Sequence, residues 1–126
     1  MPENKSKRIL IAEDEKAYSR ALVLKLTNAG FYAECCANGE EAIEALKKGN
    51  FDLLLCDLVM PKMNGFQILE ELSKLGLKIP VIGLSNLSQS DDEKKMRAAG
   101  AVDFILKSNT PIFEVVEKIK AFLNKK

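Results

Sequence analysis

The chain has 126 residues, of which 47% are hydrophobic, and a formal net charge of +1 at pH 7. This length is typical of a single domain that buries one core without disulfide or metal cross-links. Because the charges nearly cancel, the net charge recruits neither nucleic acid nor an anionic membrane, and we expect neither as a direct partner. The longest apolar runs are far shorter than the roughly 20 residues that span a bilayer. The polar segment Met1 to Arg8 also lacks the apolar core of a signal peptide, so we expect a cytoplasmic protein.

The cysteine and histidine content limits the chemistry that is available to the chain. Cys35, Cys36 and Cys56 do not have the spacing of a zinc site, and we expect all three to be buried small apolar side chains. The sequence contains no histidine, which excludes Ser-His-Asp and Cys-His triads and histidine-ligated metal sites. Any chemistry must therefore use carboxylates, hydroxyls and lysine.

Short apolar segments alternate along the chain with segments of helical periodicity. This alternation is typical of an α/β fold in which helices cover a parallel sheet. In chain order, the sequence predicts a strand over Arg8 to Ala12, a helix over Lys16 to Ala29, a strand over Tyr32 to Cys36, a helix over Gly39 to Lys48, a strand over Leu53 to Cys56, a helix over Gly65 to Leu75, a strand over Val81 to Leu84, a helix over Asp91 to Ala99, a strand over Val102 to Leu106 and a helix over Ile112 to Asn124.

Residues at the expected helix ends support these boundaries. Asn38, Asn64 and Ser90 each precede an expected helix and can cap it. Thr110 before Pro111 predicts an N-terminal cap with proline at the first helical position. Four glycines stand where a helix commonly ends in a left-handed residue: Gly30, Gly49, Gly76 and Gly100.

Polar residues follow the expected strands at the edge where ligands bind in open parallel sheets. Glu13-Asp14-Glu15 follow the first strand, and Asp57, Ser85 and Lys107 follow the third, fourth and fifth. Taken singly, each has a structural explanation as a turn residue, a cap or a solvated charge. Taken together, they place at least three carboxylates beside one lysine, and a hard divalent cation such as Mg²⁺ would relieve the repulsion between the carboxylates.

Carboxylates around a cation indicate phosphoryl chemistry, because phosphoryl transfer needs an in-line nucleophile and positive charge on the transferring oxygens. In this interpretation Asp57 is the nucleophile. Lys107 and the cation supply the positive charge, and the Ser85 hydroxyl donates to a phosphoryl oxygen.

Several motifs occur in a fixed order along the chain: Ile9-Leu10-Ile11-Ala12-Glu13-Asp14-Glu15, Leu55-Cys56-Asp57-Leu58-Val59-Met60-Pro61, Met63-Asn64-Gly65, Val81-Ile82-Gly83-Leu84-Ser85 and Gly100-Ala101-Val102-Asp103-Phe104-Ile105-Leu106-Lys107. With these motifs the chain resembles the receiver domains of two-component response regulators, including the single-domain chemotaxis type. The resemblance covers essentially the whole chain. It implies one receiver domain over residues 1–126 with an ordered core of about 7–124. The implied fold is a doubly wound five-stranded parallel sheet in the flavodoxin-like order 2-1-3-4-5, with helices on both faces.

The resemblance also implies the roles of individual residues in the metal site. Asp57 corresponds to the phosphoacceptor, Asp14 to a direct ligand of Mg²⁺ (or Mn²⁺), and Glu13 to an acid that holds the cation partly through water. Asp57 and the main-chain carbonyl of Val59 complete the protein ligands.

The remaining implied roles concern the switch and its partners. Lys107 would form an ion pair with the phosphoryl group, and Ser85 would be the switch hydroxyl that follows it. Phe104 would be the aromatic residue that turns inward with Ser85, although its alternative role is that of a core aromatic. The resemblance implies a histidine kinase or a histidine phosphotransfer protein as the donor. A downstream protein would bind the surface of the fourth helix, fifth strand and fifth helix.

The chain departs from the family pattern at several positions. Ser108 follows Lys107 where the family usually has a cis proline, and we predict a trans bond because a cis bond before a non-proline residue costs about 2.5–4 kcal/mol. Asn86 stands where alanine is common, and its amide can crowd or hydrogen-bond the phosphoryl pocket. Val59 and Leu87, two residues beyond the phosphoacceptor and the switch hydroxyl, cannot orient a water, so we predict slow self-dephosphorylation.

Three other classes of protein are alternatives. A pseudo-receiver that keeps the fold without phosphorylation is disfavoured by the complete set Glu13, Asp14, Asp57, Ser85 and Lys107. A flavin-binding domain is disfavoured because the loop after the first strand is acidic and lacks a main-chain phosphate cradle. A phosphatase with its nucleophile on the first strand is disfavoured because the D-x-D pattern is absent there.

Overall fold

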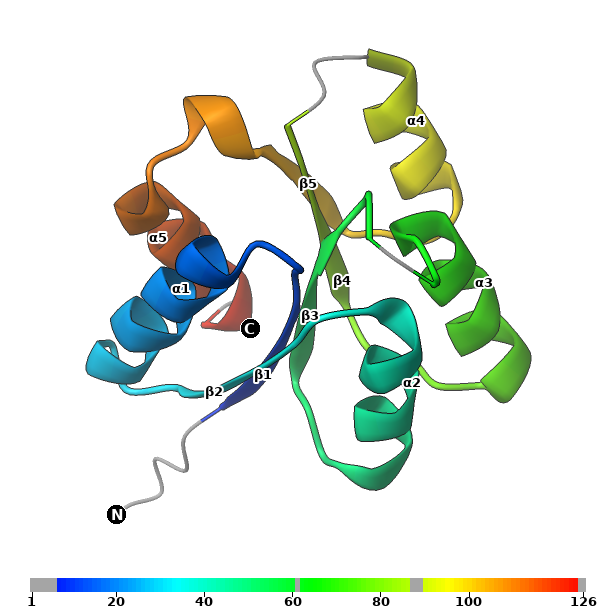
Figure 1. Ribbon diagram of the computed structural model, residues 1–126, viewed down its shortest axis with the longest axis horizontal. Coiled ribbons are helices and arrows are strands. Elements are labelled where there is room, and N and C mark those ends of the chain that lie inside the picture. Colours follow the sequence, from blue (N-terminus) through cyan, green and yellow to red (C-terminus); the bar gives the residue numbers. More distant parts are fainter. Residues whose placement is uncertain (1–6, 61, 87–89, 125–126) are drawn as a thin grey trace.

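The structure is a computed structural model that describes residues 7–60, 62–86 and 90–124. Strands and helices alternate along this part of the chain (Figure 1). Their bounds are β1 Arg8–Ala12, α1 Lys16–Asn28, β2 Tyr32–Cys36, α2 Gly39–Lys48, β3 Leu53–Asp57, α3 Gly65–Leu75, β4 Val81–Ser85, α4 Ser90–Ala98, β5 Asp103–Leu106, a short 3-10 helix Lys107–Asn109 and α5 Ile112–Leu123. Every strand and α-helix lies where the sequence predicts it, with ends that differ by at most one residue.

The five strands form one parallel sheet in the order β2-β1-β3-β4-β5, which confirms the predicted fold class. The sheet is in register so that Ala12 of β1 pairs with Cys56 of β3, and Asp57 pairs with Leu84 of β4. The residues that follow or end these three strands therefore lie side by side. All carboxyl ends of the strands point to the same edge, which is the upper edge in Figure 1.

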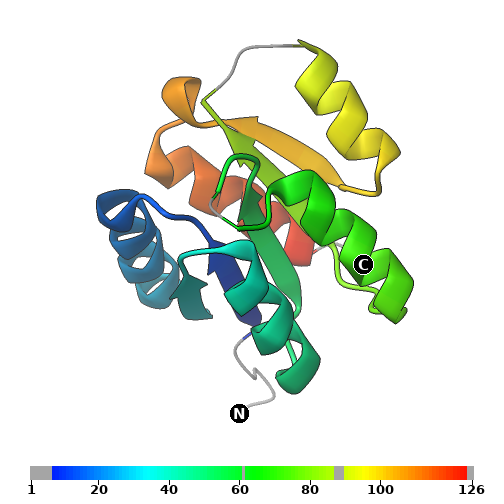
Figure 2. The ribbon, with the colours of Figure 1, turned by 45° about the vertical axis from the view of Figure 1, so that its right-hand side comes forward.

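Helices cover both faces of the sheet. In Figure 1, α1 and α5 lie to the left of the sheet and α2, α3 and α4 to the right, and Figure 2 shows the same layers from a second direction. Ile9 and Ile11 of β1 pack toward α1 and α5, whereas Leu10 and Ala12 pack toward the other helices. Alternating side chains of one strand thus enter two separate cores, which explains why β1, β3 and β4 are apolar at almost every position.

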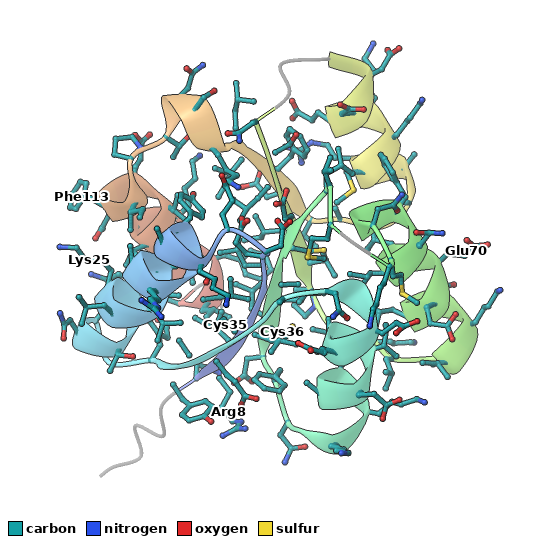
Figure 3. All side chains as sticks on the ribbon, viewed as in Figure 1. Arg8, Lys25, Cys35, Cys36, Glu70 and Phe113 are labelled. Atoms are coloured by element: carbon teal, nitrogen blue, oxygen red, sulfur yellow. The ribbon has the colours of Figure 1, made fainter. Side chains whose placement is uncertain are left out.

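The expectation that all three cysteines are buried is wrong for two of them. Cys56 is fully buried in β3, but Cys35 is exposed and Cys36 is half-buried. Both belong to β2, an edge strand of the sheet (Figure 3), and an edge strand is covered less completely than a central one. All three are free thiols.

Several predicted helix ends are confirmed. The Asn38 and Asn64 side chains accept hydrogen bonds from the third residues of their helices, and Asn64 forms a complete capping box with Gln67. Positive φ occurs at three of the four glycines: Gly30, Gly76 and Gly100. No cis peptide bond occurs in the described part of the chain, so the bond between Lys107 and Ser108 is trans, as predicted.

Other predicted ends are wrong by one residue or in conformation. Gly49 ends α2 in an extended conformation, and its lack of a side chain instead leaves room for the Phe51 ring, which would lie 2.8 Å from an added Cβ. Pro111, not Thr110, occupies the cap position of α5, because Thr110 still belongs to the 3-10 turn through its bond to the Lys107 carbonyl. The helix α4 begins at Ser90, one residue earlier than predicted. Among the described helices, none has the length and apolar character required to cross a membrane.

Candidate functional site

A pocket of about 320 Å³ opens at the carboxyl edge of the sheet. Its walls come from the β1–α1 loop, the ends of β3 and β4, and the residue that follows β5. The lining residues are Asp14, Glu15, Asp57, Val59, Ser85, Asn86 and Lys107. Six of these seven were candidates from the sequence alone, so the fold brings together residues that are distant along the chain.

Three carboxylates meet at this pocket. Glu13, Asp14 and Asp57 each offer an oxygen, and these oxygens all lie within 4.8 Å of one another. Asp14 is exposed, whereas Glu13 is 2% and Asp57 6% exposed. Burial and the negative charge of Glu13 raise the pKa of Asp57 to about 7, although the positive charge of Lys107 acts in the opposite direction.

This acidic cluster fits a divalent cation. The donors are hard oxygen atoms at the carboxyl ends of two central, neighbouring strands, and they are close enough to share one ion, which is the donor set that Mg²⁺ prefers. Burial and the charge of Glu13 disfavour the ionised form of Asp57, and a divalent cation beside it would favour that form. The three acids are therefore consistent with a divalent metal site.

Lys107 places one positive charge against the acids. Its Nζ atom lies 2.8 Å from Glu13 Oε1 and 3.6 Å from Asp57 Oδ2, and it also donates to Glu15 Oε1. Only 5% of the Lys107 side chain is exposed. Burial by itself would lower the pKa of Lys107, but its hydrogen bonds to Glu13 and Glu15 and the charge of Asp57 raise it, so the ammonium group stays charged.

Main-chain hydrogen bonds hold the two acidic loops in place. The Glu13 carboxylate accepts the N–H of Glu15 at 2.9 Å, and the Glu13 N–H donates to the carbonyl of Cys36 in β2 at 3.0 Å. The Val59 N–H donates to Asp57 Oδ1 at 3.3 Å. The Val59 side chain itself is 60% exposed at the mouth of the pocket.

Ser85 and Phe104 lie on one side of the sheet but not in one pocket. Ser85 ends β4, is buried, and lines the pocket. Phe104 is paired with Gly83, two residues before Ser85, and packs against the core outside the pocket. An added Cβ on Gly83 would lie 2.7 Å from Met96 Cε of α4 and 3.1 Å from the Phe104 ring, so the bare backbone of Gly83 lets these two side chains pack closely on the sheet. Leu87, for which the sequence predicts an effect on phosphate lifetime, is outside the described residues.

Two residues in contact with Lys107 were given no role from the sequence. Glu15 was visible as part of the acidic run, but its contact with Lys107 joins positions 92 residues apart. Tyr18 lies in the first turn of α1 with its ring centroid 4.7 Å from Lys107 Nζ. No local sequence pattern indicates either contact, because both depend on how the start of α1 is placed relative to Lys107, 89 or more residues later in the chain.

Residues 9–120 match the response regulator receiver domain family. The chain belongs to this family. A receiver domain is the phosphoacceptor module of two-component signalling, and here it carries the acidic pocket of Glu13, Asp14 and Asp57 with Lys107 beside it. The family, the fold class and the signalling function predicted from the sequence are thereby confirmed.

Curated relatives of this receiver domain include two transcriptional regulatory proteins. It is 33% identical over 100 residues to DltR of Streptococcus agalactiae, covering 79% of this chain and 45% of DltR. It is 32% identical to PcoR of Escherichia coli over 118 residues, covering 94% of this chain and 52% of PcoR. The chain thus spans about half the length of these curated relatives.

Solved structures show the same fold in other receivers. The phosphorylated cyanobacterial phytochrome response regulator RcpA superposes with a TM-score of 0.83 at 30% identity, with 94% of each chain covered. A CheY-like receiver domain protein from Methanospirillum hungatei superposes with a TM-score of 0.87 at 28% identity, with 95% of each chain covered.

Proposed function

We propose that Asp57 accepts the phosphoryl group. Asp57 is the buried carboxylate that lines the pocket, lies 3.6 Å from the Lys107 ammonium group and shares a cluster with two further acids. This juxtaposition carries the proposal. A carboxylate oxygen of Asp57 forms the new P–O bond while the P–N bond of a phosphohistidine donor breaks, and the electron pair of that bond stays on the imidazole nitrogen.

Mg²⁺, or Mn²⁺ in its place, would be held by Glu13, Asp14, Asp57 and the main-chain carbonyl of Val59. The cluster of acid oxygens within 4.8 Å of one another supports this ligand set. When bound, the cation supplies positive charge to the transferring phosphoryl oxygens. The protein itself supplies the nucleophile and excludes water from its buried side, since Asp57 is 6% exposed.

Lys107 and Ser85 would bind the transferred group from two sides. Lys107 directly follows β5. Its side chain is buried, and the attraction between its positive charge and the phosphoryl oxygens is stronger there than in water. Ser85 ends the strand next to β3, so its hydroxyl can donate to a phosphoryl oxygen on Asp57. Asn86 borders the same pocket and would limit its size or add a further donor.

The signal would leave through α4, β5 and α5. Phosphorylation adds about two negative charges at the sheet edge. The phosphoryl oxygens compete with the carboxylates for Lys107 and also attract the Ser85 hydroxyl. Ser85 lies two residues from Gly83, against which Phe104 and Met96 pack. We propose that Ser85 and Phe104 shift the population of α4–β5–α5 arrangements, and that a downstream protein binds this surface.

Membership of the receiver family suggests the phosphoryl donor and the location of this domain. We propose a histidine kinase or a histidine phosphotransfer protein as donor, in the cytoplasm, with no direct contact between this chain and nucleic acid or membrane. Residues 1–126 would form one receiver domain with an ordered core of about 7–124. Relatives such as DltR and PcoR are longer transcriptional regulatory proteins, of which this chain spans about half the length.

The test is incubation with acetyl phosphate and Mg²⁺ followed by intact-mass measurement. The wild type should gain about 80 Da, and a chelator should prevent the gain. Asp57→Asn should abolish it, whereas Asp52→Asn should not, because Asp52 lies at the opposite end of β3 where it accepts the N–H of Arg8. Persistence of the gain in Asp57→Asn would exclude Asp57 as the acceptor.

A further inference from the structure

The ring of Tyr18 forms the one uncharged side of the Lys107 environment among the contacts described. Lys107 Nζ lies over the ring, 4.7 Å from its centroid. The other partners of this ammonium group are the carboxylates of Glu13, Glu15 and Asp57. An aromatic ring attracts a cation through its quadrupole, and the attraction is larger when the cation is removed from water, as Lys107 is here.

The carboxylate contacts of Lys107 change when the site is used, whereas the neutral ring of Tyr18 binds neither the metal ion nor the phosphoryl group. Glu13 holds Nζ at 2.8 Å, closer than Asp57 at 3.6 Å. A cation shared by the acids would weaken the hold of Glu13, and a phosphoryl group on Asp57 would add new acceptors. Tyr18 competes for neither, because it offers a neutral face at a fixed position in the first turn of α1.

The Tyr18 hydroxyl takes no part in this contact. Its oxygen is buried and has no hydrogen-bond partner among the described residues. Burial raises the pKa of Tyr18, so the ring remains neutral. A buried hydroxyl without a partner costs stability rather than adding to it. The useful part of the side chain is therefore its ring face.

We propose that Tyr18 is a positioning residue whose ring face holds the Lys107 ammonium group within reach of the phosphoryl group on Asp57. This inference rests on the proposed function of Asp57 and Lys107. With Tyr18 in place, Lys107 does not have to be reoriented as its carboxylate partners change, and its charge is directed to the pocket. Without the ring, the flexible four-carbon side chain of Lys107 is less restricted. Its ammonium group is then held less often beside the phosphoryl group, so phosphorylation slows.

The decisive variants keep the shape of residue 18 and change the ring electrons. Tyr18→Phe should phosphorylate with acetyl phosphate and Mg²⁺ at the wild-type rate. Replacement of Tyr18 by phenylalanines with one, two and three ring fluorines should slow the reaction stepwise. Each fluorine withdraws electron density from the ring and so weakens the attraction of its face for the Lys107 ammonium group. Tyr18→Leu should slow it about three- to tenfold.

A second readout needs neither metal nor phosphate. In the metal-free protein, the ε-methylene protons of Lys107 should resonate upfield in wild type and Tyr18→Phe because they lie over the ring. In Tyr18→Leu this displacement should disappear. Since the fluorinated variants are nearly isosteric, they keep the test decisive even if Tyr18→Leu folds poorly.

Tyr32 offers a matched control. Its ring lies 4.2 Å from the Arg8 guanidinium. Arg8 begins β1 at the edge of the sheet opposite the pocket (Figure 3), so Tyr32→Leu removes a cation–π contact without touching the pocket. Tyr32→Leu should leave the phosphorylation rate unchanged. Equal rates across the fluorinated series, or equal slowing in Tyr18→Phe and Tyr18→Leu, would overturn the role of the ring. Failure of the proposed function is separate, since it would appear as a wild type that gains no mass.

Discussion

The buried carboxylate of Asp57 should make the stability of the metal-free protein depend on pH. Burial and the charge of Glu13 raise its pKa from 3.8 to about 7. Between these pH values the folded protein keeps a proton that the unfolded chain has released, so the free energy of unfolding falls as the pH rises. At about 1.4 kcal/mol per pH unit, the loss reaches about 4 kcal/mol and is complete above about pH 7.

Asp57→Asn removes the titrating group and keeps its shape, so it should recover this loss. In urea unfolding followed by circular dichroism with a chelator present, the variant should be more stable than wild type by up to about 4 kcal/mol at about pH 8. At about pH 4 the two proteins should differ little, because Asp57 is then protonated in the folded wild type. Equal stabilities at the higher pH, or an advantage that persists unchanged at the lower pH, would refute the reasoning. Saturating Mg²⁺ should stabilise wild type more than the variant.

Three further substitutions test other parts of the structure. Gly39→Ala would place a Cβ 2.4 Å from the Cβ and the carbonyl oxygen of Met63. The free energy of unfolding in urea should therefore fall by about 2 kcal/mol. An unchanged value would mean that Gly39 and Met63 lie less close together. Lys107→Met would leave Glu13 buried without its cation, so stability at about pH 8 should fall by about 3 kcal/mol and phosphorylation, followed by intact mass, should slow about 100-fold. Val59→Asn would put an amide at the pocket mouth to orient a water, and the phosphorylated form should decay about tenfold faster after removal of the donor; an unchanged lifetime would contradict this role.

The fold could be predicted from the sequence because its signals are local and agree with one another. Apolar runs of strand length alternate with amphipathic helices, and caps such as Asn38 and Asn64 act within three residues of themselves. The errors arose where a side-chain contact or the position of a strand in the sheet, rather than a local sequence pattern, decides the outcome. Gly49 is required by the Phe51 ring rather than by a left-handed turn, and Cys35 is exposed because β2 lies at the sheet edge.

The sequence predicted those site residues that stand at, or directly after, the carboxyl end of a strand. Asp14, Asp57, Ser85 and Lys107 meet because parallel strands bring their carboxyl ends to one edge, so their positions follow from topology. The contact of Tyr18 with Lys107 could not be predicted in this way. It depends on where packing against the sheet places the first turn of α1 relative to Lys107, and no local sequence pattern fixes that placement.

The helix α4 is attached to the rest of the domain by few buried side chains. Among its described side chains, only Met96 is buried, inserted beside the bare backbone of Gly83, while Arg97 bonds to Asp103 at the surface. In the proposed switch, a helix with so few contacts can tilt on the sheet at little cost in core packing. Because the outer side chains of α4 are solvent-exposed, substitutions there can diversify the choice of partner at little risk to folding.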